Sequence, residues 1–75
     1  MENVKMSVSR TDGVWRLWVQ TEDSKESRKL LSDIAGCWQS TEDPGMIETR
    51  VMYPFKGLAQ MLSDVMKVIA AAAKI

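Results

Sequence analysis

Few residues of this chain could do chemistry, and their types exclude most catalytic arrangements. The 75-residue sequence has no histidine and a single cysteine, Cys37. Without histidine, Ser-His and Cys-His nucleophile pairs and most zinc sites cannot form. Cys37 follows Leu30, Leu31 and Ile34 at helical spacing, so we expect a buried structural thiol. The four glycines are isolated and build no phosphate loop. We therefore predict a protein that is not an enzyme, with no catalytic residues and no cofactor.

The acidic residues suggest solvation rather than metal binding. If the first hairpin tip and the start of the last strand share one end of the sheet, Asp12, Glu42 and Asp43 form an acidic rim there. Their spacing matches no calcium-binding loop. We expect a solvated rim and no metal site.

The most suggestive surface residue is Trp18. The alternation in Val14–Gln20 places Trp18 and Arg16 on the face opposite Leu17 and Val19. An exposed tryptophan beside arginine is typical of an interface hot spot. The other interpretation is that Trp18 packs over Ser7 and the aliphatic part of Arg16, which stabilises the sheet without binding anything. The residues predicted to bind a protein are Arg16, Trp18, Gln20, Glu48, Arg50 and Met52.

The same face supports an alternative function. Trp18 could stack on a base while Lys5, Arg16 and Arg50 hold phosphates, as in a single-stranded nucleic-acid binder. Only one aromatic residue is available and Glu48 shares the face, so nucleic acid is the less favoured partner.

Composition and charge bound the protein further. Seventy-five residues make one small domain, spanning 1–75. Ten basic residues balance ten acidic ones, so no global field favours nucleic acid or an anionic membrane. The acidic start of the chain is unlike a signal peptide, and we expect a cytoplasmic protein. Gln60, Ser63, Asp64 and Lys67 interrupt the last apolar segment, which argues against a membrane span.

A hairpin is the clearest element of the sequence. Strands are expected at Asn3–Arg10 and Val14–Thr21, joined by an Asp12-Gly13 turn. In this register the numbers of opposed residues sum to 25, so that Val8 meets Leu17. A third strand is predicted from Met46 to Tyr53, where Pro54 ends it.

Two helices complete the expected elements. The first begins at Asp23 or Ser24, with Glu26 as partner in a capping box, and ends near Trp38. The second spans about 56–73, and its apolar spine is Leu58, Leu62, Val65 and Ile69. The apolar sector of this helix is wider than one sheet needs, so pairing of two C-terminal helices in a homodimer would bury the excess.

The expected fold is an α+β two-layer sandwich with the order ββαβα. The preferred three-stranded sheet has strand order 2-1-3, with both helices on one face; order 1-2-3 with a parallel pair stays open. In the preferred order the strand Val14–Thr21 lies at an edge, where it could accept a partner's strand.

Our hypothesis for function is a small non-catalytic protein-binding module. It would act as an adaptor or inhibitor through the Trp18 face or the edge strand. The size and the missing chemistry also suggest a phage or mobile-element protein that blocks a host or defence protein. Two alternatives are the nucleic-acid binder described above and a homodimer that binds a small ligand between its subunits.

Overall fold

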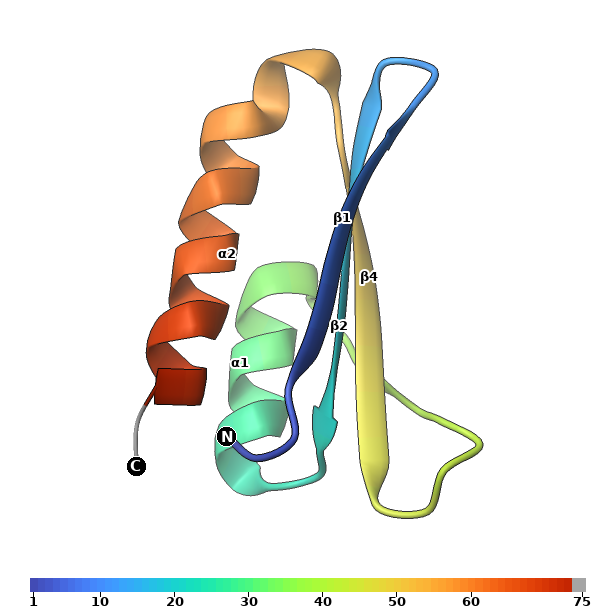
Figure 1. The fold of residues 1–75 in the computed structure, drawn as a ribbon, viewed down its shortest axis with the longest axis vertical. Helices are drawn as coiled ribbons and strands as arrows, with labels where there is room; N and C mark the ends of the chain where they lie inside the picture. The colour runs from blue at the N-terminus through green and yellow to red at the C-terminus, as the bar shows by residue number, and fades with distance from the viewer. Residues whose placement is uncertain (74–75) are drawn as a thin grey trace.

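The chain folds into two layers, a four-stranded antiparallel sheet and a pair of helices on one side of it (Figure 1). The structure is a computed structural model and describes residues 1–73. Its elements are β1 (Lys5–Thr11), β2 (Val14–Glu22), α1 (Lys25–Ala35), β3 (Gln39–Ser40), β4 (Met46–Tyr53), the 3-10 turn η1 (Phe55–Gly57) and α2 (Leu58–Ala73). The predicted α+β class is confirmed. Within residues 1–73, no helix is long and apolar enough to cross a membrane.

The strand order is β1-β2-β4-β3, which differs from the preferred prediction. The long strands follow the order 1-2-3 rather than 2-1-3, and β4 pairs with β2 antiparallel rather than parallel. β2 is therefore a central strand with both sides hydrogen-bonded. The predicted use of Val14–Thr21 as an edge strand for a partner is wrong.

The segment between α1 and β4 explains this difference. After α1 the chain runs back along the sheet through β3, where Gln39 lies opposite Glu48 and Ser40 opposite Ile47. Nine residues, 37–45, can span up to about 30 Å when extended, which is more than the about 16 Å rise of an 11-residue helix. The amide of Asp23 donates to the carbonyl of Gly45 at 2.7 Å. β4 therefore starts at the end where β2 finishes, and the two strands are antiparallel.

The predicted hairpin and its register are confirmed. Asp12 and Gly13 both have positive φ, 52° and 76°, as a two-residue hairpin turn of this hand requires. The opposed numbers sum to 25 from Thr11–Val14 to Lys5–Gln20. The register extends into β4, which places Leu17 opposite Val51 and Trp15 opposite Tyr53.

The core lies between the sheet and the helices. Its buried apolar side chains come from the two central strands and both helices: Leu17, Val19, Leu31, Ile34, Ile47, Tyr53, Met61 and Val68. The β1 strand contributes only the half-buried Met6, because the helices lie over β2 and β4.

α1 begins as predicted but is capped by a different residue. Ser24 is the N-cap, and its hydroxyl accepts from the amide of Ser27 at 3.0 Å. The Ser27 hydroxyl, not Glu26, accepts the amide of Ser24 in return. The helix ends at Ala35, because Gly36 adopts a left-handed φ of 78°. This turn takes Cys37 off the apolar side of the helix, so the predicted burial of its thiol is wrong and Cys37 is exposed.

α2 presents a different face to the core from the one its pattern predicts. Met61, Asp64 and Val68 are buried, whereas three of the four predicted spine residues, Leu58, Leu62 and Ile69, are exposed. The Asp64 side chain accepts a hydrogen bond from the Tyr53 hydroxyl at 2.6 Å.

That hydrogen bond explains how a carboxylate can occupy the core. Asp64 is 3% exposed, and it also accepts from Gln60 at 3.2 Å and lies 3.7 Å from the Lys67 ammonium. Burial raises the pKa of the Tyr53 phenol, and the hydrogen bond and charge of Asp64 raise it further. A buried polar pair that is fully hydrogen-bonded is tolerated in a core.

Candidate functional site

The side of the sheet that faces away from the helices is uncovered (Figure 1). We call it the open face. A shallow hollow of about 240 Å³ lies on this face. The side chains around this hollow belong to Ser7, Ser9, Arg16, Trp18, Arg50 and Met52. Alternation along β1, β2 and β4 places them here, because their neighbours in sequence point into the core.

The structure brings all six predicted protein-binding residues together on the open face. They form three cross-strand pairs between β2 and β4: Arg16 opposite Met52, Trp18 opposite Arg50, and Gln20 opposite Glu48. Side chains at such positions lie within contact range of one another. The predicted strand order would have separated these two strands by β1. In the actual order β2 and β4 are neighbours, so the three pairs form one compact block of six residues.

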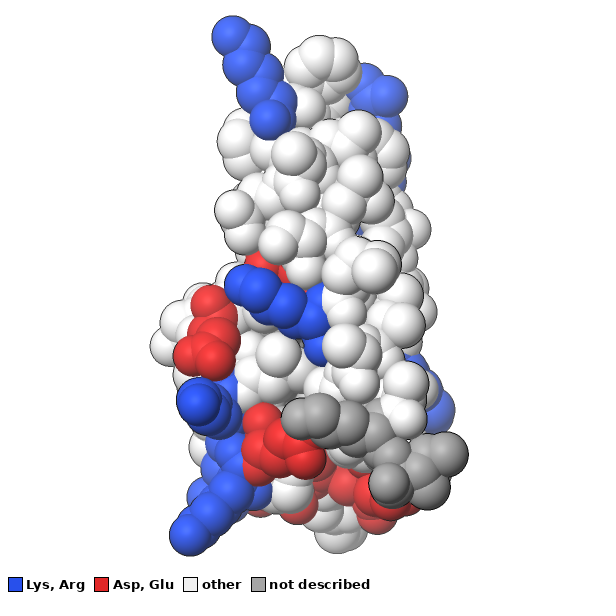
Figure 2. Space-filling model, turned by 90° about the vertical axis from the view of Figure 1, so that its left-hand side faces the viewer, with Lys and Arg blue, Asp and Glu red and all other residues white. Residues whose placement is uncertain are grey.

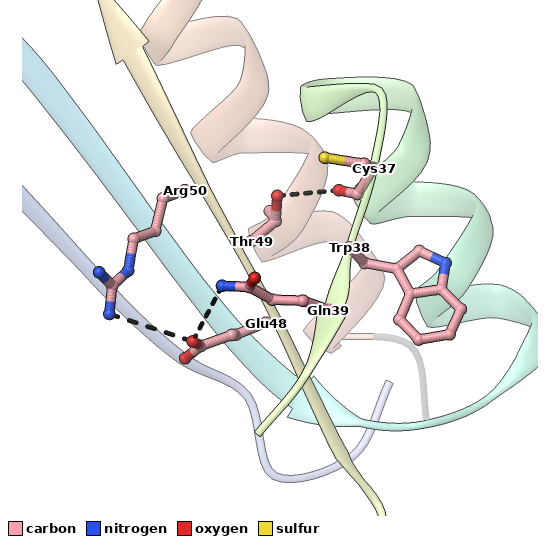
Figure 3. A pocket seen from close by; sticks show the side chains of 6 residues that line it. All are labelled: Cys37, Trp38, Gln39, Glu48, Thr49 and Arg50. Carbon is pink, nitrogen blue, oxygen red and sulfur yellow. Dashed lines mark hydrogen bonds and ion pairs between the residues drawn. The ribbon is translucent and has the colours of Figure 1, made fainter. Parts of the chain in front are cut away.

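Glu48 connects the polar groups of this block. Its Oε2 accepts from the Trp18 indole nitrogen at 3.0 Å. Its Oε1 accepts from Gln39 at 3.4 Å and lies 4.0 Å from the Arg50 guanidinium (Figure 3). One carboxylate therefore orients an aromatic ring, an amide and a cation. Trp18 is held in one orientation before any partner arrives.

Exposure divides the block into two parts. Gln20 is only 9% exposed, so it is not available as predicted, and Trp18 is half-buried rather than free in water. Met52 is 66% exposed, and Arg16 and Arg50 are also exposed. A partner would therefore contact Met52, the two arginines and one part of the Trp18 ring.

The open face carries an excess of positive charge. Within residues 1–73, Arg16 has no carboxylate within ion-pair distance, and Arg50 has only the long contact to Glu48. Lys5 of the nucleic-acid alternative lies on the same face, opposite Gln20. The four residues of that alternative, Lys5, Arg16, Trp18 and Arg50, are thus spread over three strands.

The expected acidic rim is wrong. Asp12 is in the β1–β2 turn, at the end of the sheet where β4 finishes, because Trp15 lies opposite Tyr53. Glu42 and Asp43 precede the start of β4, at the other end. The antiparallel pairing of β2 and β4 separates these groups.

Gln39 is a residue of this site that the sequence did not indicate. It belongs to β3, a strand absent from the predicted elements, and a two-residue strand is too short to show an alternating pattern. Beside it lies a second hollow of about 240 Å³, lined by Cys37, Trp38, Gln39, Glu48, Thr49 and Arg50. In Figure 3 the Trp38 ring points toward α1, where the Arg28 guanidinium lies 5.0 Å from its centre.

The exposed groups of the open face can make apolar contacts and charge-assisted hydrogen bonds. They are the Trp18 indole, which donates to Glu48, the Met52 thioether, and the guanidiniums of Arg16 and Arg50. The chain is not significantly similar to any family model, curated protein or solved structure with which it was compared. What supports a function is therefore the geometry of the open face.

Proposed function

We propose that this protein is a cytoplasmic, non-catalytic protein-binding module, an adaptor or inhibitor whose partner occupies the open face. The observation that carries this proposal is the block of three cross-strand pairs on a sheet face that no helix within residues 1–73 covers. A phage or mobile-element protein that blocks a host or defence protein would fit a chain of 75 residues without histidine and with a single cysteine.

The residue types of the block favour a protein partner. Tryptophan, arginine and methionine are enriched in the centres of protein interfaces. The Trp18 ring is already fixed by Glu48, so little conformational entropy is lost when a partner covers it. Met52 adapts its shape to the surface it meets.

The charge of the block indicates the chemistry of the partner. Arg16 is exposed and has no carboxylate within ion-pair distance among the described residues, and Arg50 has only the 4.0 Å contact to Glu48. We expect the partner to bring one or more carboxylates to these guanidiniums, surrounding an apolar centre that meets Trp18 and Met52.

Substitutions on the open face test the proposal. Arg16→Glu and Met52→Lys change exposed side chains, so the fold should persist, which circular dichroism checks. Lys29→Glu on α1 is the matched control, because it reverses an exposed charge on the other side of the molecule. We expect affinity capture from a cell extract to recover specific proteins with the wild type and the control. Both open-face variants should lose them.

A purified partner then allows a quantitative test. Trp18→Ala should raise its dissociation constant by about 30-fold, as expected for a hot spot worth about 2 kcal/mol. Retention of every captured protein by a folded Trp18→Ala variant would remove the open face from the interaction. Binding to a labelled single-stranded oligonucleotide that weakens steeply with salt, and that Arg16→Glu abolishes, would favour the nucleic-acid alternative instead.

A further inference from the structure

The charged residues that line the hollow of the open face are all positive. Arg16 and Arg50 line it, and among residues 1–73 no Asp or Glu does. Within the same residues Arg16 has no ion-pair partner, and Arg50 has only the contact to Glu48 at 4.0 Å. The Glu48 carboxylate also accepts from Trp18 and Gln39, so its charge is shared among three donors. The hollow therefore carries a net positive charge.

The helix side of the molecule mixes its charges instead. Figure 2 shows this side, where positive and negative side chains lie beside one another in the lower half. Arg28 pairs with Asp23, and Lys67 pairs with Asp64. The chain as a whole has a net charge of zero. The positive charge of the hollow is thus a local feature, and it favours an anion at that place.

The strand register sets the two arginines of the hollow at a suitable separation for one shared anion. Arg16 lies opposite Met52 and Arg50 lies opposite Trp18, so the arginines are diagonal neighbours on β2 and β4. Residues in such positions are about 7 to 8 Å apart, which is within the reach of two arginine side chains. Two cations this close repel each other, and an anion between them replaces that repulsion by attraction.

A phosphoryl group matches this pair of cations. A phosphorylated side chain carries a charge of about −1.5 to −2 at pH 7 and three strong acceptor oxygens. Guanidiniums bind phosphate through parallel hydrogen bonds. The exposed hydroxyls of Ser7 and Ser9, on the β1 side of the hollow, are further donors. A carboxylate of the partner neutralises one guanidinium, whereas one phosphoryl group neutralises both.

The apolar neighbours of the arginines indicate what carries the phosphoryl group. The pairs Arg16–Met52 and Trp18–Arg50 each set a cation beside an apolar side chain, and all four residues line the hollow. Indole and thioether groups make favourable contacts with aromatic rings. A phosphate on an aromatic ring uses both kinds of neighbour. The backbone of a nucleic acid fits less well, because each of its phosphates carries a single charge.

We propose that the hollow between Arg16 and Arg50 binds a phosphotyrosine side chain of the partner protein. The guanidiniums hold the phosphoryl oxygens, and Trp18 and Met52 contact the ring. This inference rests on the function proposed above, because it names the group by which that partner is recognised. Phosphorylation of the partner then controls its binding.

An NMR titration of the ¹⁵N-labelled full chain with N-acetyl-phosphotyrosine amide tests the hollow directly. We expect saturable shifts of backbone amides in β2 and β4 around Trp18 and Arg50, at concentrations up to about 10 mM. Arg16→Gln and Arg50→Gln should each weaken binding at least about tenfold, since each removes hydrogen bonds to a charged group. Lys29→Gln is the matched control, because it removes an exposed positive charge on α1, and it should bind like the wild type. Circular dichroism verifies that each variant is folded.

Related probes test the assignment to phosphotyrosine. N-acetyl-phosphoserine amide should bind about tenfold more weakly, because it lacks the ring that meets Trp18 and Met52. N-acetyl-tyrosine amide should not bind. The proposal would be overturned by equal binding of either probe, by the absence of saturable binding of the phosphotyrosine derivative, or by binding that both arginine variants leave intact. Displacement of the derivative by micromolar oligothymidylate would assign the hollow to nucleic acid and also overturn it.

Phosphatase treatment separates this inference from the function on which it rests. Proteins captured by the wild type should be lost when the cell extract is first treated with a tyrosine-specific phosphatase. Capture that survives this treatment but that Arg16→Glu abolishes would leave the protein-binding function standing and overturn the phosphotyrosine inference. The titration needs no partner, so its result does not depend on whether capture succeeds.

Discussion

At the scale of single residues, Glu48 fixes the geometry of the open face. Its carboxylate accepts hydrogen bonds from the indole nitrogen of Trp18 and from the amide of Gln39. Its own position follows from the register, which sets it opposite Gln20 in β2 and opposite Gln39 in β3. In the sequence Glu48 looks like one more charged residue on a polar face. In the structure it is the residue that orients the side chains of Trp18 and Gln39.

Tyr53 and Asp64 form a residue-scale contact whose loss should destabilise the fold. Tyr53→Phe removes the hydroxyl that donates to the buried Asp64 at 2.6 Å. We expect the free energy of unfolding to fall by about 1 to 3 kcal/mol, the usual effect of a hydrogen bond to a buried charged group. Urea unfolding at pH 7 measures this loss. The exposed Gln60 supplies the other hydrogen bond to Asp64, so Gln60→Ala should lower the free energy of unfolding by less.

The same pair predicts a pH dependence in alkali. Burial and the nearby Asp64 raise the pKa of the Tyr53 phenol above its ordinary value of 10. Above pH 10 the unfolded chain has lost this proton and the folded chain retains it. The contribution of the Tyr53 phenol to the free energy of unfolding is therefore fully present below pH 10. It decreases as the pH rises further, by up to about 1.4 kcal/mol per pH unit. Tyr53→Phe lacks this contribution, so its stability should converge on that of the wild type in alkali. Parallel pH profiles would contradict this prediction.

At the scale of elements, the start of α1 depends on Ser27. Its buried hydroxyl accepts the Ser24 amide at 2.8 Å and donates to the Glu22 carbonyl at 2.8 Å. We expect Ser27→Ala to lower the free energy of unfolding by about 1 to 2 kcal/mol. Glu26→Ala changes the residue that the sequence suggests for this role and should cost less than about 0.5 kcal/mol. Thermal unfolding of the two variants compares them. Equal losses would show that Glu26 also caps the helix.

The elements whose causes are local were predictable from the sequence. Asp12 and Gly13 define a turn by their own backbone preferences, and the strand alternation then sets the register. Alternation also determines the face on which a side chain lies, whichever strand is its neighbour. For that reason the six residues of the open face come together although the predicted strand order is wrong.

The remaining features depend on contacts between distant segments. α2 has apolar residues over most of its circumference, so its periodicity cannot decide which side is buried; in the structure the buried side carries Asp64, which meets the hydroxyl of Tyr53, 11 residues earlier in the chain. The return of the chain through 37–45 makes β4 antiparallel to β2, and the two residues of β3 are too few to reveal this path. Neither contact leaves a pattern within a short window of sequence.

At the scale of the whole molecule, the position of β2 predicts where the fold is most resistant to opening. β2 is paired on both sides and carries the fully buried residues Leu17, Val19 and Thr21. β3 has two residues and one neighbour. Hydrogen exchange followed by mass spectrometry or NMR should therefore find the slowest backbone amides in β2 and much faster exchange in β3. Slowest exchange in β1 would contradict the central role of β2.

The position of Cys37 has a practical consequence for work on this protein. It is the chain's single thiol, it is exposed, and it lies at a hollow that Arg50 of the open face also lines. A maleimide dye attached there would sit next to the surface on which a partner is expected, without any engineered cysteine. Its fluorescence could then report the arrival of that partner in real time.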